Sequence, residues 1–176
     1  MEKNPPHNSG DPMLAVPAEN TGKLTDTADF QFREGLRLGS AGTRDDYLLA
    51  AECYRSAAKQ GHSLAQLNLA IMYSRGQGLA RDVAMSSYWL TKAANGGDCG
   101  AQYMLGMARN RGSLDEMSAD AAESRIEAYK WLSLAAAQGH DDAAAGCDLV
   151  AMGMTLETVR EGKRRADVFV CGTPPC

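Results

Sequence analysis

The chain has 176 residues, a formal net charge of −4, and 44% hydrophobic but only 6% aromatic residues. The negative balance argues against a general nucleic-acid-binding protein, because such proteins need a basic surface. No apolar run approaches the roughly 18 residues that span a bilayer, and the first residues lack the basic flank and apolar core of a signal peptide. We therefore expect one cytoplasmic domain with no membrane insertion.

The first 23 residues are rich in Pro, Gly, Asn and Ser and show no hydrophobic periodicity, so we expect them to be disordered. Thr25-Asp26 offers N-cap oxygens to a first helix that we expect to end near Leu38, before a turn at residues 39–42. Thr43, with Asp46 three residues on, caps the next helix, which ends at Gly61 because Gly enters the left-handed region without penalty.

The rest of the chain continues in the same way. Ser63 to Gln66 matches a capping box at the start of a helix, and Asp82 caps its partner. Further helices are expected at 63–75, 82–94, 98–112, 126–137, 141–152 and 155–169, with 113–125 as an acidic insertion and 171–176 as a loose tail. Strand patterns are nearly absent, so the fold class is all-α.

Three of these helices share one ending, an Ala-Ala pair followed by a Gly three positions after it. The glycines are Gly61, Gly97 and Gly139, which are 36 and 42 residues apart. A repeat of 20 to 50 residues is typical of a solenoid. The repeats predict an α/α superhelical solenoid of antiparallel helix pairs with a right-handed twist.

The repeat pattern resembles the Sel-1-like repeat, a relative of the tetratricopeptide repeat. The residues that carry the resemblance in the two best copies are Ala65, Leu69, Ala70, Tyr73, Gly76, Gly78, Asp82, Trp89, Ala93, Ala94 and Gly97, then Ala101, Leu105, Gly106, Gly112, Trp131, Ala136, Ala137 and Gly139. Arg109 stands where Tyr is usual. The first copy is weaker, with Ala28, Phe32, Leu36 and Gly39 in place but Arg33 at the small-residue position. The resemblance implies a repeat domain over residues 24–170.

The pattern also has a physical interpretation. A small residue at Ala70 or Gly106 lets the two helices of a hairpin approach closely, and Trp89 and Trp131 fill the gap between successive hairpins. The structural repeat positions are therefore Ala70, Trp89, Gly97, Gly106, Trp131 and Gly139.

No residue pattern indicates chemistry. Gly76-Gln77-Gly78 has no third Gly and no preceding strand, so it predicts a turn and not a nucleotide site. His62 and His140 occupy matching positions after the turn Gly, where a role at the helix start is favoured over metal binding. The run Glu161 to Arg165 is interpreted as a solvated basic helix face. We expect no enzyme activity, no cofactor and no metal site.

Five cysteines are an odd number and follow no repeat spacing, so they do not form a disulfide framework. Cys53 is interpreted as a buried small hydrophobe. Whether Cys171 and Cys176 pair is left open, and no partner stands at zinc spacing from them.

By analogy with tetratricopeptide repeats, the first helix of each pair lines a concave face. The predicted partner-binding residues on it are Arg37, Leu67, Ile71, Arg75, Tyr103, Met107 and Arg111. The apolar members are not needed by the hairpin core, and an apolar strip beside arginines suits a peptide or helix with apolar and acidic groups. The alternative, that neighbouring hairpins or the tail cover this strip, stays open.

The resemblance favours a non-enzymatic adaptor that binds a protein or peptide partner. Two alternatives remain. The first is a secreted or periplasmic protein, associated with the cell wall or hydrolase-like, as reported for some bacterial relatives. The second is a structural repeat with weak self-association, since the weak first copy leaves an apolar end.

Overall fold

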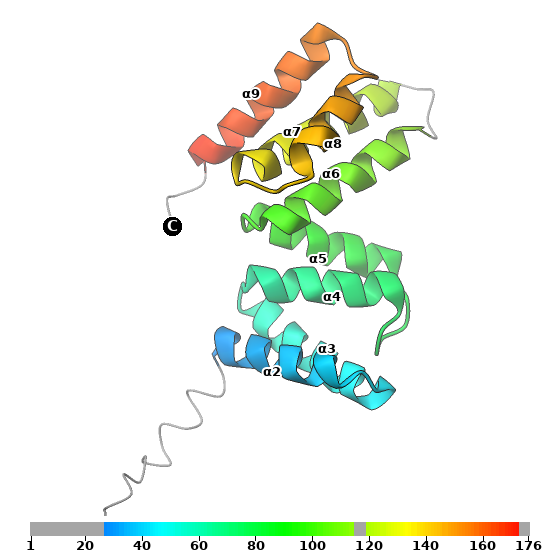
Figure 1. Cartoon of the computed structure of the whole chain (residues 1–176), viewed down its shortest axis with the longest axis vertical. Helices are drawn as coiled ribbons and strands as arrows, with labels where there is room; N and C mark the ends of the chain where they lie inside the picture. Colours follow the sequence, from blue (N-terminus) through cyan, green and yellow to red (C-terminus); the bar gives the residue numbers. More distant parts are fainter. Residues whose placement is uncertain (1–26, 115–118, 173–176) are drawn as a thin grey trace, which may run out of the picture.

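The computed structural model of the chain describes residues 27–114 and 119–172, and within these ranges every regular element is an α-helix. The helices stack in chain order along one long axis (Figure 1). They are α2 (Ala28–Ala41), α3 (Arg44–Lys59), α4 (Ser63–Arg75), α5 (Val83–Asn95), α6 (Cys99–Leu114), α7 (Ala119–Ala137), α8 (Ala143–Ala151) and α9 (Leu156–Gly172). The predicted all-α solenoid is confirmed.

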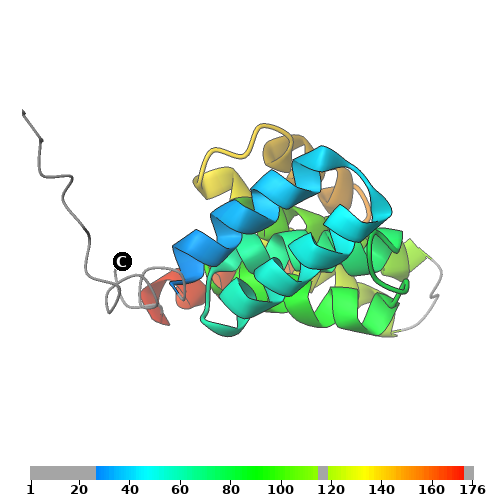
Figure 2. The ribbon, with the colours of Figure 1, turned by 90° about the horizontal axis from the view of Figure 1, so that it is seen from below.

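The helices pair as predicted. α2 packs on α3, α4 on α5 and α6 on α7, and each hairpin meets the next through its second helix, α3 with α4 and α5 with α6. α8 and α9 both pack against α7, so the C-terminal end is a three-helix group (Figure 1). An end-on view shows α2 crossing the stack at one end (Figure 2).

Several helix ends follow the predicted signals. The side chains of Thr43 and Asp82 cap α3 and α5 by accepting bonds from the backbone amides three residues on. Gly61, Gly97 and Gly139 have φ of 91°, 87° and 83°, the left-handed conformation that other residues avoid. After each of them the chain turns directly into the next helix.

Several helix boundaries differ from the prediction, among them that of the last helix, which runs to Gly172 and so includes the first two residues of the predicted loose tail. The first helix is capped by Thr27, not by Thr25 or Asp26, and it continues through Gly39 to end at Gly42, where φ is 81°. α6 likewise continues through Gly112 to Leu114. Gly39 and Gly112 therefore lie inside helices, because a glycine does not end a helix by its residue type alone.

The six extra residues of the third repeat do not form an extended loop. α6 has 16 residues and α7 has 19, whereas α4 and α5 have 13 each. The segment between the helices is correspondingly shorter, with residues 115–118 outside the described ranges. The insertion therefore lengthens the hairpin, and most of the predicted acidic insertion at 113–125 is helical.

Close approach within hairpins rests on small residues. A Cβ on Gly106 would lie 2.7 Å from Leu132 Cγ, so α6 and α7 could not pack as they do with a larger residue there. In the first hairpin the corresponding residue is Gly35, whose added Cβ would meet the Tyr54 ring at 2.6 Å. Arg33 is exposed. The predicted register of the first copy was therefore wrong by two residues.

The two tryptophans lie in the core as predicted. Trp89 is 9% exposed and Trp131 is 5% exposed, and both belong to one hydrophobic cluster that runs through the hairpins. Trp131 also meets Phe169 of α9 edge-on, with ring centroids 5.3 Å apart. The C-terminal helix is thus joined to the repeat core through an aromatic pair.

Cys53, Cys99 and Cys147 are free, half-buried thiols. Burial raises the pKa of Cys53 and of Cys147 above the ordinary thiol value. The predictions for residues 1–23 and for Cys176 lie outside the described residues.

Candidate functional site

One repeat position of the predicted partner-binding strip, occupied by Leu67 and Tyr103, packs each hairpin against the next. Phe32 is its equivalent in the first repeat. Phe32 in α2 stacks on His62 at the start of α4, and Tyr103 in α6 stacks on His140 before α8, both with ring centroids 4.4 Å apart. Leu67 in α4 packs against Gly100 at the start of α6. The premise that Leu67 and Tyr103 are not needed by the core was therefore wrong, because both stack successive first helices.

The helix-start prediction is confirmed for His62 and wrong for His140, because α8 begins at Ala143 with Asp142 as its N-cap. The Nδ1 atom of His62 accepts a hydrogen bond from the Ala65 amide at 3.3 Å and caps α4. The Nδ1 atom of His140 is buried without a hydrogen-bond partner among the described residues. Asp98 holds the same position in the intervening repeat and bonds the Ala101 amide at 2.7 Å. The position therefore caps the following helix in the first two repeats, at His62 and Asp98, but not at His140.

The capping box predicted at Ser63 does not form. His62 is the N-cap, and the buried Gln66 amide donates to the Ala58 carbonyl at 3.0 Å. Gln102, one repeat later, donates to the Ala94 carbonyl at 3.2 Å in the same way. Each Gln thus adds a bond to a carbonyl in the last turn of the preceding helix, which also accepts from the backbone amide of the turn glycine, Gly61 or Gly97.

Of the remaining apolar residues of the strip, Met107 packs against the second core cluster around Leu132, whereas Ile71 borders an open groove. This groove, the α2–α4 groove, has a volume of about 290 Å³. It is lined by Leu36, Gly39, Ser40, Tyr47, Ala50, Tyr54, Asn68, Ile71, Met72 and Gln77. Leu36 is 46% exposed on its rim. The α2–α4 groove, which Tyr47, Ala50 and Tyr54 of α3 also line, is the candidate binding site.

The predicted arginines divide into two kinds. Arg37 is paired with Glu34 one turn away, with Nε 3.0 Å from the carboxylate. Arg75 and Arg111 are exposed at the last turns of α4 and α6, and no ion pair joins either of them to a carboxylate in the described ranges. Asp82, seven residues after Arg75, caps α5, and Asp115, four residues after Arg111, lies outside the described residues.

The sequence reasoning missed Leu36, Asn68 and Met104. With Gly35 at the small-residue position, Leu36, Ile71 and Met107 share one repeat position, and Arg33, Asn68 and Met104 share another. Met104 is 37% exposed. The signal was present in the sequence, because Gln31, Gln66 and Gln102 recur at intervals of 35 and 36 residues and align the three copies correctly.

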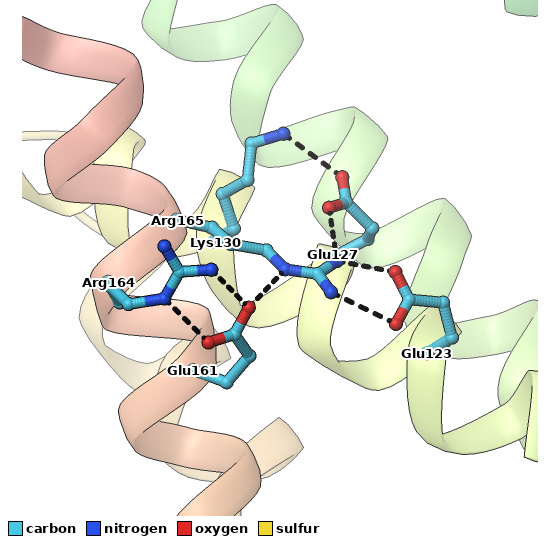
Figure 3. Close-up of polar contacts among 6 residues, drawn as sticks. All are labelled: Glu123, Glu127, Lys130, Glu161, Arg164 and Arg165. Carbon is cyan, nitrogen blue, oxygen red and sulfur yellow. Dashed lines mark hydrogen bonds and ion pairs between the residues drawn. The ribbon is translucent and has the colours of Figure 1, made fainter.

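The presumed basic patch on the last helix is an ion-pair network (Figure 3). Arg165 in α9 bonds the carboxylates of Glu123 and Glu127 in α7 and of Glu161 in its own helix, the last two at 2.9 and 2.8 Å. Arg164 pairs with Glu161 at 2.7 Å, and Lys130 pairs with Glu127 at 3.0 Å. Three cations and three carboxylates balance, so the network presents no net charge and joins α9 to α7.

The same contacts lower the pKa values of two of these carboxyl groups. Hydrogen bonds from Arg164 and Arg165 lower the pKa of Glu161 to about 2. Burial opposes ionisation of Glu127, but hydrogen bonds from Lys130 and Arg165 hold its pKa below the usual value. The network therefore has a structural role and stays ionised at neutral pH.

Within the described residues, no group of three His, Cys, Asp or Glu side chains is placed to hold a metal ion. None of the described helices is both long and apolar enough to cross a membrane.

The stacked hairpins define the class of protein: an α/α repeat with aromatic and small residues at fixed repeat positions. The family model of the Sel1 repeat matches residues 31–62, 63–98 and 100–140. These matches span more than half of the chain, and the chain belongs to the Sel1 repeat family.

Two solved structures share the fold. One is c5321, a protective antigen present in uropathogenic Escherichia coli strains and displaying an SLR fold; it has a TM-score of 0.72 and 22% identity over 86% of this chain and 31% of its own. The other is a Sel1 repeat protein from Oxalobacter formigenes, with a TM-score of 0.64 and 24% identity over 82% of this chain and 61% of its own. This chain thus spans less than two thirds of either. No curated protein matches it.

Proposed function

We propose that this protein is a non-enzymatic interaction scaffold that binds a segment of a protein partner along the face formed by α2 and α4. The α2–α4 groove supports this proposal, because it leaves the apolar side chains of Leu36 and Ile71 accessible between two hairpins. A groove with an apolar rim is the kind of surface in which an extended or helical segment anchors one or two side chains.

The chemistry of the partner follows from the charges beside the groove. Arg75 lies one turn beyond Ile71 on α4, and Arg111 lies one repeat further along on α6. Like charges on neighbouring hairpins repel only weakly when solvated, by about 1 kcal/mol or less. The partner segment therefore carries apolar side chains for the groove and an acidic residue for the arginines, which contribute mainly orientation and encounter rate.

The residues of the predicted partner-binding strip differ in whether they affect stability or binding. Leu67, Tyr103 and Met107 pack between hairpins, so substitutions there act on stability as well as on binding. Leu36 and Arg75 are exposed, and substitutions there act on the partner alone. The useful test variants are therefore Leu36→Ser and Arg75→Gln.

The test begins with capture of partners by the wild-type chain, followed by calorimetric titration of one purified partner. We expect the Leu36→Ser and Arg75→Gln double variant to bind that partner with a Kd at least tenfold higher than that of the wild type. The loss of affinity should be greater at low salt than at high salt. The control is Tyr88→Ser on α5, which changes a 50% exposed aromatic away from the groove. An equal loss in the control, or no loss in the double variant, would overturn the proposal.

Weak self-association is a second candidate. Leu149, Met152 and Leu156 are 52%, 84% and 79% exposed at the corner between α8 and α9, an apolar end that a second copy could cover. Sedimentation equilibrium tests this directly. A Met152→Ser variant should lower the dimer fraction, whereas the Leu36→Ser variant should leave it unchanged.

A further inference from the structure

A histidine caps the helix that begins the second hairpin. His62 lies between α3 and α4, and its side chain is only 15% exposed. Its Nδ1 atom accepts a hydrogen bond from the Ala65 amide at 3.3 Å, which makes His62 the N-cap of α4. A ring nitrogen that accepts a hydrogen bond carries no proton, so the imidazole that caps α4 is neutral. Capping by Nδ1 and protonation of Nδ1 therefore exclude each other.

The capped turn of α4 also joins the first two hairpins. The His62 ring stacks on Phe32 of α2, with the ring centroids 4.4 Å apart. Gln66, in the first turn of α4, donates from its side-chain amide to the Ala58 carbonyl in the last turn of α3 at 3.0 Å. Both helices of the first hairpin are thus held by residues at the start of α4. Loss of the cap would loosen the turn that makes these contacts.

The second junction, where the α4–α5 hairpin meets α6, is built in the same way without a histidine. Asp98 takes the place of His62 and bonds the Ala101 amide at 2.7 Å, and Gln102 repeats the bond of Gln66 to the preceding helix. A carboxylate keeps its acceptor oxygens between pH 5 and 8, the range in which an imidazole gains or loses a proton. Equivalent junctions of one chain therefore differ in whether a proton can remove the cap.

The charged groups around His62 do not replace the lost cap. Asp29 of α2 lies 3.4 Å from Nε2, but its side chain is 79% exposed, so its attraction for a charged imidazole is weak and leaves Nδ1 without its bond. The N-terminus of α4 disfavours a positive ring, because the helix dipole is positive there. Carboxylates, ammonium groups and guanidinium groups keep their charge between pH 7.5 and 5.5. On the neighbouring elements these are Arg33 in α2, Lys59 at the end of α3, Lys92 in the last turn of α5 and Asp98 before α6.

We propose that His62 makes the junction between the first two hairpins sensitive to acid. When the imidazole takes up a proton on Nδ1, the Ala65 amide loses its acceptor, the first turn of α4 frays, and the α2–α3 hairpin loosens on α4. The second junction keeps its cap at Asp98 over the same pH range. Because α2 and α4 also line the α2–α4 groove, the affinity of that groove for its partner should fall in acid, a consequence that rests on the proposed function.

The test compares two amides in one sample of the whole chain. Hydrogen exchange followed by NMR gives the protection factors of the Ala65 amide, capped by His62, and of the Ala101 amide, capped by Asp98. Between pH 7.5 and 5.5 we expect the protection factor of Ala65 to fall at least tenfold and that of Ala101 to change less than twofold. Long-range ¹H–¹⁵N spectra of the imidazole show whether His62 is charged at pH 5.5. Parallel behaviour of the two amides, or a neutral His62 at pH 5.5, would overturn the proposal.

Variants assign the effect to the cap. His62→Asp copies the second junction, and His62→Asn offers an uncharged cap, so both should make the protection factor of Ala65 independent of pH between 7.5 and 5.5. His62→Ala should give the low protection factor at both pH values. A fall in His62→Asp as large as that in the wild type would rule out the cap as the cause.

The other stacked histidine provides a matched control. His140 also stacks on an aromatic ring, that of Tyr103, but it caps no helix, because α8 has Asp142 as its N-cap. We expect His140→Asn to leave the response of the Ala65 amide to pH unchanged. Loss of the response in this variant would place its origin at His140 and overturn the assignment to His62.

Loosening of the junction is followed separately, through the side-chain amide of Gln66. Its bond to the Ala58 carbonyl crosses from α4 to α3, and the equivalent bond of Gln102 is the internal reference. Between pH 7.5 and 5.5 the exchange protection of the Gln66 side chain should fall, with that of Gln102 unchanged. Full protection of Gln66 at pH 5.5 would show that the first hairpin is not released. None of these measurements involves a partner, so their failure would be distinct from failure of the proposed function.

Discussion

The α4–α5 and α6–α7 hairpins share the same core repeat positions but differ in the lengths of their helices. Both keep a buried Trp on the second helix and a small residue on the first. The former uses short helices and a connecting segment that folds back on α3, whereas the latter extends both helices. The core positions therefore specify the stacking, whereas the lengths of the helices vary between hairpins without disturbing it.

The largest effect should come from the Trp that ties the last helix to the repeats. Trp131→Ala removes a buried side chain whose ring contacts Phe169 edge-on. The same ring makes a cation–π contact with Lys130, whose Nζ lies 4.2 Å from the ring centroid. We expect the substitution to lower the free energy of unfolding by about 3–5 kcal/mol in urea denaturation. Phe169→Ala and the double variant complete a cycle with a coupling of about 1 kcal/mol. Strict additivity would show that α9 does not depend on this pair.

Replacing a glycine of α6 by alanine should have opposite effects on stability at two positions. Gly106→Ala places a methyl against Leu132 and should destabilise the fold by about 1–2 kcal/mol, because overpacking exceeds the gain in helix propensity. Gly112→Ala in the same helix meets no atom within 4 Å and should stabilise it by about 0.5–1 kcal/mol. Thermal unfolding measures both. A loss of stability at Gly112 would contradict the helical extension of the third repeat.

The ion-pair network is specific to the third hairpin and the last helix. Arg165→Gln leaves three carboxylates without their shared cation, so we expect a loss of about 1–3 kcal/mol in urea denaturation at pH 7. Arg164→Gln removes a solvent-exposed pair with Glu161 alone, so it should cost less than Arg165→Gln. Equal costs for the two variants would mean that the network does not join α9 to α7.

Acid should weaken the same network. The pKa values of Glu161 and Glu127 are lowered in the folded protein, so their ionisation stabilises the fold above the ordinary glutamate pKa of 4.5. That contribution is lost as the pH falls from about 4.5 towards 2, the pKa of Glu161. Denaturation curves at pH 7, 4 and 2.5 should show the decline in the wild type and a shallower one in Arg165→Gln.

The smallest effect concerns thiol reactivity. Burial raises the pKa of Cys53 and of Cys147, so both should react slowly with iodoacetamide at pH 7.5. Cys176, predicted to lie on a loose tail, should react rapidly. Mass spectrometry of tryptic peptides separates the sites. Rapid labelling of Cys53 would show that α3 is less well packed than the structure indicates.

Much of the fold was predictable because it depends on repeated local signals. The Ala-Ala-x-x-Gly endings, the caps at Thr43 and Asp82 and the small residue at Gly106 act within one or two turns, and all are confirmed. Gly39 and Gly112 misled the prediction, because a glycine can lie within a helix or end one, and tertiary packing decides which.

The candidate site was less predictable because exposure depends on the neighbouring hairpin. Leu67 and Tyr103 follow the same helical spacing as Ile71, but the first turn of the next repeat covers them. The ion pairs of Arg165 with Glu123 and Glu127 connect residues 42 and 38 apart, a distance that no local pattern reveals.

The central claim, that the face of the first helices recognises a partner, is tested most directly by hydrogen–deuterium exchange of the chain with and without its purified partner. We predict slower exchange in α2 and α4 around Leu36 and Ile71 when the partner is bound, and a loss of that protection in the Leu36→Ser and Arg75→Gln double variant. Protection confined to α8 and α9, with α2 and α4 unchanged, would contradict the claim.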